Sequence, residues 1–152
     1  MPLCRVKPNV SSTDTLTPSE RSKRMSLVRS KDTKPELTVR RLVHNSGFRY
    51  RLHGKGLPGK PDLVFAGRHK VIFVHGCFWH RHLKRSCSLA RLPKSRLDFW
   101  QPKLEQNRVR DKQKQAMLRR LGWRVFVVWE CELKAPDKLE SKIIDFLSPE
   151  AT

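Results

Sequence analysis

The chain has 152 residues, of which 33 are Lys or Arg and 14 are Asp or Glu, so its formal net charge is +19 at pH 7. It holds no run of about 18 apolar residues, and residues 1–10 lack the apolar centre of a secretory signal, so we expect neither a membrane span nor export. Hydrophobic residues make up 38% of the chain, which is enough for one small core and argues against full disorder. So large a positive charge requires a polyanion nearby, and nucleic acid is the expected partner.

The amino-terminal part divides into a tail and the start of a folded domain. Residues 1–18 are rich in Ser, Thr and Pro without periodicity, and we interpret them as a flexible tail preceding one domain over residues 19–150. A short basic helix is predicted from Pro18 onward. A second helix is predicted after Thr33 as its N-cap, with Pro35 and Glu36 in the first turn and Gly47 as its stop.

The central part has the pattern of a β-sheet. Apolar residues alternate with arginines over residues 48–52, which predicts a strand, and three glycines and two prolines over residues 53–61 predict a loop. Two apolar runs, residues 62–66 and 70–76, follow with a short connection between them. They predict an antiparallel hairpin at the centre of the sheet.

The second half alternates between helix and strand patterns. A Cys- and His-rich loop over residues 77–94 precedes a helix that Ser95 and Asp98 would cap, that Pro102 would kink or restart and that Gly122 would end. The apolar run over residues 123–129 predicts a fully buried strand, and a last helix is predicted from Pro136. The expected fold is therefore α/β, with a mixed central sheet flanked by helices.

Cysteine spacing in the loop indicates a metal site. Cys77, His82 and Cys87 are separated by four residues each, and Cys131 follows the next predicted strand. Three thiolates and one imidazole form a closed set of the kind that holds structural zinc, which would fasten the loop to the strand end. His80 is a competing imidazole, and three separately buried cysteines are the alternative.

One acid marks a candidate catalytic centre. Asp62 begins the first apolar strand of the hairpin, and the second strand ends in Val74 and His75. Carboxylate and carbonyl oxygens suit Mg²⁺, which would polarise a phosphodiester. His75 and His80 can exchange protons near neutral pH. On the helices, Asp111 could orient one of these histidines and Glu36 could position water or a histidine, although each of these residues also fits an ordinary structural role.

Aromatic pairs in polar segments suggest stacking on DNA. Phe78 and Trp79 follow Cys77, and a second pair precedes Gln101 at residues 99–100. Such rings can enter between base steps, and a mismatched step is easier to open than a paired one. Core packing is the alternative, and we favour it for Trp123 and Trp129. We favour stacking for Phe78, Trp79 and Trp100, in part because of the family resemblance described next.

Taken together, six segments resemble the very-short-patch-repair (Vsr) DNA mismatch endonucleases. They are residues 25–36, 57–65, 71–82, 93–100, 107–111 and 121–133, with HGCFWH and the stretch from Gly122 to Leu133 as the most specific. The resemblance implies a restriction-endonuclease-like fold with a zinc-stapled loop. It also implies an enzyme that nicks DNA on the 5′ side of the thymine in a T·G mismatch. Such mismatches arise when 5-methylcytosine deaminates, and short-patch repair follows the nick.

The same resemblance assigns roles to individual positions. Asp62 and the backbone carbonyl of Val74 would bind the catalytic Mg²⁺. His80 would be the general base with Asp111 as its partner, and His75 and Glu36 would support them. Structural zinc would be bound by Cys77, His82, Cys87 and Cys131. The residues that contact the mismatch would be Phe78, Trp79, Trp100, Lys103 and Asn107.

Three functions remain to be distinguished. The first is the Mg²⁺-dependent nickase, which we expect to act as a monomer in the cytoplasm, near the nucleoid, on double-stranded DNA and in concert with mismatch-repair proteins. The second is a non-catalytic, structure-specific DNA-binding zinc protein. The third is a basic zinc protein that assembles with RNA. Asp62 separates the first two, because a pure binder has no use for an acid beside bound phosphates.

Overall fold

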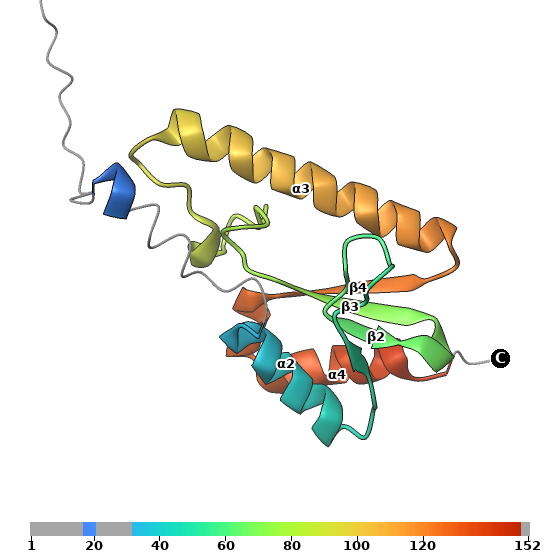
Figure 1. Cartoon of the computed structure of the whole chain (residues 1–152). Coiled ribbons are helices and arrows are strands. Elements are labelled where there is room, and N and C mark those ends of the chain that lie inside the picture. Colours follow the sequence, from blue (N-terminus) through green and yellow to red (C-terminus); the bar gives the residue numbers. More distant parts are fainter. Residues whose placement is uncertain (1–16, 21–31, 150–152) are drawn as a thin grey trace, which may run out of the picture.

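The computed structural model describes residues 17–20 and 32–149 (Figure 1). A helical turn covers residues 18–20, and the remainder of the predicted basic helix lies outside the described residues, as does most of the predicted tail. The helices are α2 (Lys34–Asn45), α3 (Leu97–Arg120) and α4 (Pro136–Leu147). The strands are β1 (Arg51–Leu52), β2 (Leu63–Phe65), β3 (Lys70–His75) and β4 (Arg124–Trp129), with short 3₁₀ turns η1 (Ala66–Arg68), η2 (Ser88–Ala90) and η3 (Glu130–Lys134).

The four strands form one mixed sheet in the order β1-β2-β3-β4. β1, β2 and β3 are antiparallel neighbours, whereas β3 and β4 run parallel with His75 opposite Trp129. The predicted central hairpin is therefore confirmed as β2 and β3, connected through η1. All six residues of β3 are buried, because this strand has a neighbour on each side and a helical layer on each face.

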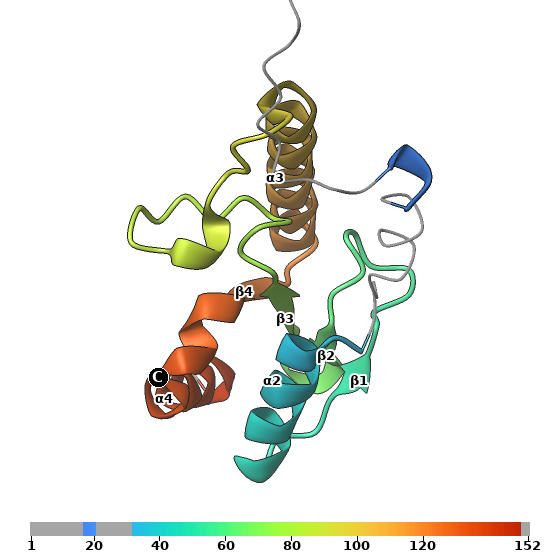
Figure 2. The same cartoon turned by 90° about the vertical axis from the view of Figure 1, so that its left-hand side faces the viewer.

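Helices cover both faces of the sheet (Figure 2). On one face, alternate strand residues such as Ile72 and Val74 pack with Val39 of α2 and Ile143 of α4. On the other face, Val71 and Phe73 of β3 pack with Leu118 of α3 in a smaller cluster. This period-two division of β3 between two cores is what a strand buried on both faces requires. The predicted α/β architecture is confirmed.

The predicted start and end of α2 are also confirmed. The Thr33 hydroxyl accepts the backbone N–H of Glu36 at 3.4 Å, and Pro35 lies in the first turn. Gly47, with φ of +92°, follows the C-cap Ser46 in a left-handed conformation that favours glycine. This cap fixes Glu36 in the first turn of the helix, at the end that faces the candidate site.

The prediction of a capping box at the start of α3 is wrong: the N-cap is Arg96, at φ of +55°, and it makes no side-chain cap bond. Pro102 does not restart the helix, since α3 is continuous from Leu97 to Arg120. The proline lies early in the helix, so its missing N–H removes only one hydrogen bond near an end that lacks several in any case.

Two strand predictions also need correction. β4 is not fully buried, because only Val128 among its six residues is buried. The strand lies at the edge of the sheet, so one of its sides has no strand to cover it. The strand predicted over residues 48–52 is shorter than expected and covers only Arg51 and Leu52. Within the described ranges, no helix combines the length and the apolar character that crossing a bilayer demands.

Candidate active site

Asp62 lies where the pairing of β2 with β3 ends. The last backbone pair of this hairpin joins Leu63 to Ile72. Two residues further along β3, the N–H of Val74 donates instead to the Asp62 carboxylate, with 2.6 Å between Val74 N and Asp62 Oδ2. The N–H and C=O of one strand residue point to the same side, so the Val74 carbonyl faces the same region as the carboxylate. The structure thus brings together the two groups that the resemblance assigns to Mg²⁺.

A second carboxyl group, that of Glu36, lies beside Asp62. Glu36 is only 4% exposed, and its Oε2 accepts from the backbone N of Asp32 at 2.9 Å and from Arg40 at 3.2 Å. Burial, reinforced by the neighbouring Glu36, raises the pKa of Asp62 to about 7, although the hydrogen bond from Val74 opposes the shift. Two adjacent carboxyl groups either share a proton or bind a cation between them, so Asp62 and Glu36 fit a hard divalent ion.

His80 and Asp111 form a close pair across two segments. His80 belongs to the loop after β3 and Asp111 to α3, and 2.6 Å separates His80 Nδ1 from Asp111 Oδ2. Because a carboxylate only accepts hydrogen bonds, Asp111 fixes the tautomer in which Nδ1 carries the proton. The other ring nitrogen, Nε2, then has a lone pair that can take a proton.

The imidazole of His75 lies flat against that of His80. The ring centroids are 3.9 Å apart with an interplanar angle of 4°. His75 is 4% exposed, and burial lowers its pKa to about 3, so the ring is neutral at physiological pH. Its Nδ1 is buried and has no hydrogen-bond partner among the described residues.

These groups converge on one pocket with a volume of about 400 Å³. The five predicted catalytic residues and Val74 all line it: Glu36, Asp62, Val74, His75, His80 and Asp111. Cationic side chains that the sequence did not single out, Lys55, Lys60 and Lys114, line it as well. Acids, imidazoles and ammonium groups around one hollow are suited to binding a phosphodiester together with a metal ion.

Arg40 pairs with Glu36 and lies next to His53. Arg40 also pairs with Asp32, at 2.8 Å between Arg40 Nη1 and Asp32 Oδ1, and Arg40 Nη2 lies 3.5 Å from His53 Nε2. The sequence patterns did not point to either residue. The spacing of Glu36 and Arg40, one helical turn apart, is the signal that could have found this ion pair.

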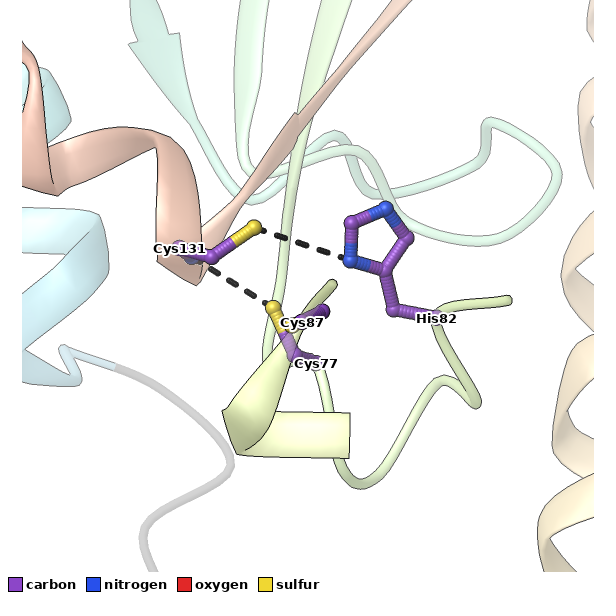
Figure 3. A group of neighbouring side chains, drawn as sticks. All are labelled: Cys77, His82, Cys87 and Cys131. Carbon is purple, nitrogen blue, oxygen red and sulfur yellow. Dashed lines mark hydrogen bonds between the residues drawn. The ribbon is translucent and has the colours of Figure 1, made fainter. Parts of the chain in front are cut away.

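The predicted zinc ligands meet in one cluster (Figure 3). The ligand atoms of Cys77, His82, Cys87 and Cys131 all lie within 4.8 Å of one another. The Cys131 N–H lies 3.4 Å from Cys77 Sγ, and Cys131 Sγ lies 3.6 Å from His82 Nδ1. The competing imidazole, His80, pairs with Asp111 instead. The alternative of separately buried cysteines is therefore wrong.

The chemistry of this Cys₃His cluster fits a cation. Cys77 is fully buried, and burial raises the pKa of its thiol to about 12. A thiolate at that position is stable only beside a positive charge, and three thiolates with one imidazole are the ligand set of structural zinc. The His82 ring also stacks on Trp129 of β4, with centroids 4.1 Å apart, which orients its Nδ1.

The predicted intercalating rings form an aromatic cluster beside this site. Phe78, Trp79 and Trp100 make edge-to-face contacts, with ring centroids 5.1 to 5.9 Å apart. Phe99 extends the cluster, since it contacts Trp100 at 5.2 Å and is 43% exposed. None of these rings belongs to the two cores that cover the sheet. Phe99 was not among the rings that the sequence led us to expect in a stacking role.

The two polar residues assigned to mismatch contact also lie at this cluster. The Lys103 ammonium lies over the rings of Phe99 and Trp100, 5.5 and 5.6 Å from their centroids. The Asn107 side-chain amide donates to the backbone carbonyl of Trp79 at 3.1 Å. Asn107 therefore holds the Cys- and His-rich loop against α3 in this structure.

Comparison with known proteins shows the class of the chain. The family described as DNA mismatch endonuclease Vsr matches residues 13–87. "Type II nicking enzyme V.XorIIP" of Xanthomonas oryzae is 54% identical over 137 residues, covering 90% of this chain and 98% of that protein. "Type II nicking enzyme V.NmeAIP" of Neisseria meningitidis is 47% identical over 122 residues, covering 80% and 85%. The fold and the matches together define a DNA nicking endonuclease, which is a hydrolase.

The family is narrower than that class. "DNA mismatch endonuclease Vsr" of Escherichia coli is 40% identical over 124 residues, covering 82% of this chain and 78% of that protein. The chain belongs to the Vsr DNA mismatch endonuclease family. Its substrate is accordingly DNA. Family membership favours the nicking enzyme over the two other hypotheses, a non-catalytic DNA-binding protein and a protein that assembles with RNA.

Proposed function

We propose that the chain nicks double-stranded DNA on the 5′ side of the thymine in T·G mismatches, and that this nick initiates very short patch repair of deaminated 5-methylcytosine. The observation that carries the proposal is the convergence of Asp62, Glu36, His75, His80 and Asp111 on one pocket. A pocket with this combination fits phosphodiester hydrolysis better than DNA binding alone, because its acids repel phosphates unless a cation is bound. We further propose that the enzyme acts as a monomer.

In this proposal the pocket binds Mg²⁺ through the Asp62 carboxylate and the Val74 carbonyl. The bound ion would polarise the phosphorus centre and stabilise the charge that develops there. Asp62 is held for this role by its hydrogen bond from Val74. Glu36, fixed by Arg40, positions water next to Asp62.

His80 would act as the general base. Asp111 holds its Nδ1 proton, so Nε2 takes a proton from the attacking water. The neutral ring of His75, stacked beneath His80, keeps the imidazole in place without adding a competing positive charge. Loss of either neighbour would let the His80 ring rotate away from the water.

Mismatch recognition would depend on the aromatic cluster. Phe78 and Trp79 come from the loop after β3 and Trp100 comes from α3, and the hydrogen bond from Asn107 to Trp79 holds these two segments together. Inserted into the duplex, the rings would separate base steps at a cost of roughly a few kcal/mol per step, and a T·G step would resist less than a T·A step. Zinc bound by Cys77, His82, Cys87 and Cys131 would fasten the loop and take no part in bond cleavage.

The decisive experiment compares Asp62→Asn with the native protein on a duplex containing one T·G mismatch, with Mg²⁺ and with EDTA. Asn keeps the size of the side chain and removes the charge that binds the cation. We expect nicking to fall by at least about a hundredfold, as when one electrostatic stabiliser of a transition state is removed. Binding of the duplex in EDTA should stay within a few fold. Native-level nicking by Asp62→Asn would show that the reaction takes place elsewhere. If the native protein nicks a T·A duplex as fast as a T·G duplex, the assignment to mismatches is wrong.

A further inference from the structure

We propose that Lys114 is a further catalytic residue, whose ammonium group binds a non-bridging oxygen of the scissile phosphate. The inference rests on the proposed location of the active site, since Lys114 lines the same pocket as Asp62 and His80. Lys55 and Lys60 line the pocket too, but both are exposed on the loop of residues 53–61, whereas Lys114 is half-buried on α3.

The position of Lys114 on α3 directs it to this pocket. It follows Asp111 by three residues, so the two side chains lie on one face of the helix. Asp111 is already paired with His80, and that pair fixes how this helical face is turned toward the loop after β3. Lys114 therefore lies on the same wall as the proposed general base, not on the outer surface of α3.

The base of the Lys114 side chain is held by close packing. Gly59, at φ of +75°, lies so near that a Cβ added to it would come within 2.9 Å of Lys114 Cβ and 3.3 Å of Phe73. A glycine at this point lets the loop backbone lie directly against α3. The base of the Lys114 side chain thus has less freedom than that of an exposed lysine, which lowers the entropy lost when its charge binds substrate.

Within the part of the chain that the structure describes, the Lys114 ammonium group has no partner that neutralises its charge. Among residues 17–20 and 32–149, Lys114 makes neither an ion pair nor a hydrogen bond. By contrast, the acids Glu36 and Asp111 in the same pocket are paired with Arg40 and His80. A half-buried, unpaired cation beside these acids is available for an anion that enters the pocket.

The scissile phosphodiester is such an anion, and the reaction increases the charge on its oxygens. Water attacks phosphorus and gives its proton to His80, a new P–O bond forms, and the bond from phosphorus to one bridging oxygen breaks. That oxygen leaves with the bonding electron pair and takes up a proton from the solvent, and His80 returns its proton to the solvent. Charge on the non-bridging oxygens must be stabilised as the transition state is reached, and a fixed cation performs this best where it has no need to reorganise.

The test compares Lys114→Met with Lys112→Met in the full chain. Met keeps most of the stem, and Lys112 is a matched control because it lies on the same helix, is exposed and does not line this pocket. Single-turnover nicking of a T·G duplex should fall by about 10²–10³-fold for Lys114→Met, the range for loss of one transition-state donor. The dissociation constant for the duplex in EDTA should change by less than about threefold, since only one of many phosphate contacts is removed.

The outcomes separate the inference from the proposed function. Lys114→Arg should recover part of the rate because it restores the charge, and Lys112→Met should nick at the native rate. A native rate for Lys114→Met, or an equal loss for Lys112→Met, would overturn the role of Lys114. If Asp62→Asn is inactive in the same assay while Lys114→Met is fully active, only this inference fails. Thermal melting monitors the fold, and Lys114→Gln replaces the Met variant if that variant melts early.

Discussion

The imidazole rings of His75 and His80 stack in parallel. The Nδ1 atom of His75 is buried and has no hydrogen-bond partner among the described residues. An unsatisfied buried polar atom costs roughly 1–3 kcal/mol, so a residue kept at such a cost is expected to serve function. The ring contact therefore couples the buried position of His75 to the orientation of His80, the proposed general base.

The first prediction concerns this nitrogen. His75→Phe keeps a flat ring beneath His80 and removes both ring nitrogens, so thermal stability should not fall, because the orphaned polar atom is gone. Nicking should nevertheless fall by about tenfold or more, because Phe supports the His80 ring but offers no nitrogen for a hydrogen bond to water or phosphate in the pocket that His75 lines. The measurements are the melting temperature and the single-turnover rate, with His44→Ala on α2 as the control. Full activity of His75→Phe would reduce His75 to a packing residue.

The second prediction is a pH dependence of Mg²⁺ binding. Burial and the nearby Glu36 raise the pKa of Asp62 to about 7, above its ordinary value of 3.8, so the metal-free carboxyl is largely protonated at pH 6. Mg²⁺ binding must displace that proton, and the apparent affinity should therefore rise about tenfold per pH unit below pH 7 and level off above it. Titration calorimetry at pH 5.5, about 6.5 and about 8 measures this trend. An affinity independent of pH over this range would contradict the assignment of Asp62 as the ligand.

The third prediction concerns the Cys₃His cluster. Purified protein should contain about one zinc ion per chain, as expected of a closed structural set. Cys131→Ser should lower the zinc content and the melting temperature together, because the end of β4 would no longer be joined to the loop after β3. Cys4→Ser changes another cysteine of the sequence and serves as the control. Unchanged zinc content and melting temperature in Cys131→Ser would show that no metal links these segments.

The fourth prediction concerns the aromatic cluster. Trp79→Ala removes a half-buried ring that contacts both Phe78 and Trp100, and it should lower the preference for T·G over T·A duplexes. Stacking of one base on an aromatic ring contributes about 1–3 kcal/mol, so the ratio of the two dissociation constants should fall by about tenfold. Phe99→Ala, at the exposed edge of the cluster, should change the ratio less. If both variants keep the native ratio, the rings do not discriminate between the duplexes.

Sequence patterns predicted the parts of the fold that depend on local chemistry. Thr33 and Gly47 mark the ends of α2 because capping and left-handed backbone are set by nearby residues. The hairpin of β2 and β3 was predictable from two apolar runs with a short connection. The burial of β4 was not, since an apolar run does not reveal whether its strand has one neighbour or two.

The candidate site likewise contains some residues that the sequence could predict and others that it could not. Asp62, the histidines and the Cys₃His set could be selected because their residue types and order point to particular chemistry. Lys114 could not, because a lysine in a chain with 33 Lys or Arg residues carries no signal of its own. Its role depends on the distance between segments remote in the sequence, namely the approach of Gly59 to α3. Arg40 could be found only through its spacing of one helical turn from Glu36.

The hairpin and loop between Asp62 and His82 supply the carboxylate, the carbonyl, both imidazoles and the first two thiol and imidazole ligands of the Cys₃His cluster. In the proposed function, the groups for phosphodiester cleavage therefore come largely from one short block of sequence, whereas Trp100 and Lys103 belong to the beginning of α3. Hybrids that exchange only residues 97–103 between relatives would test whether target preference can change while the proposed catalytic groups and the Asn107 hydrogen bond are kept.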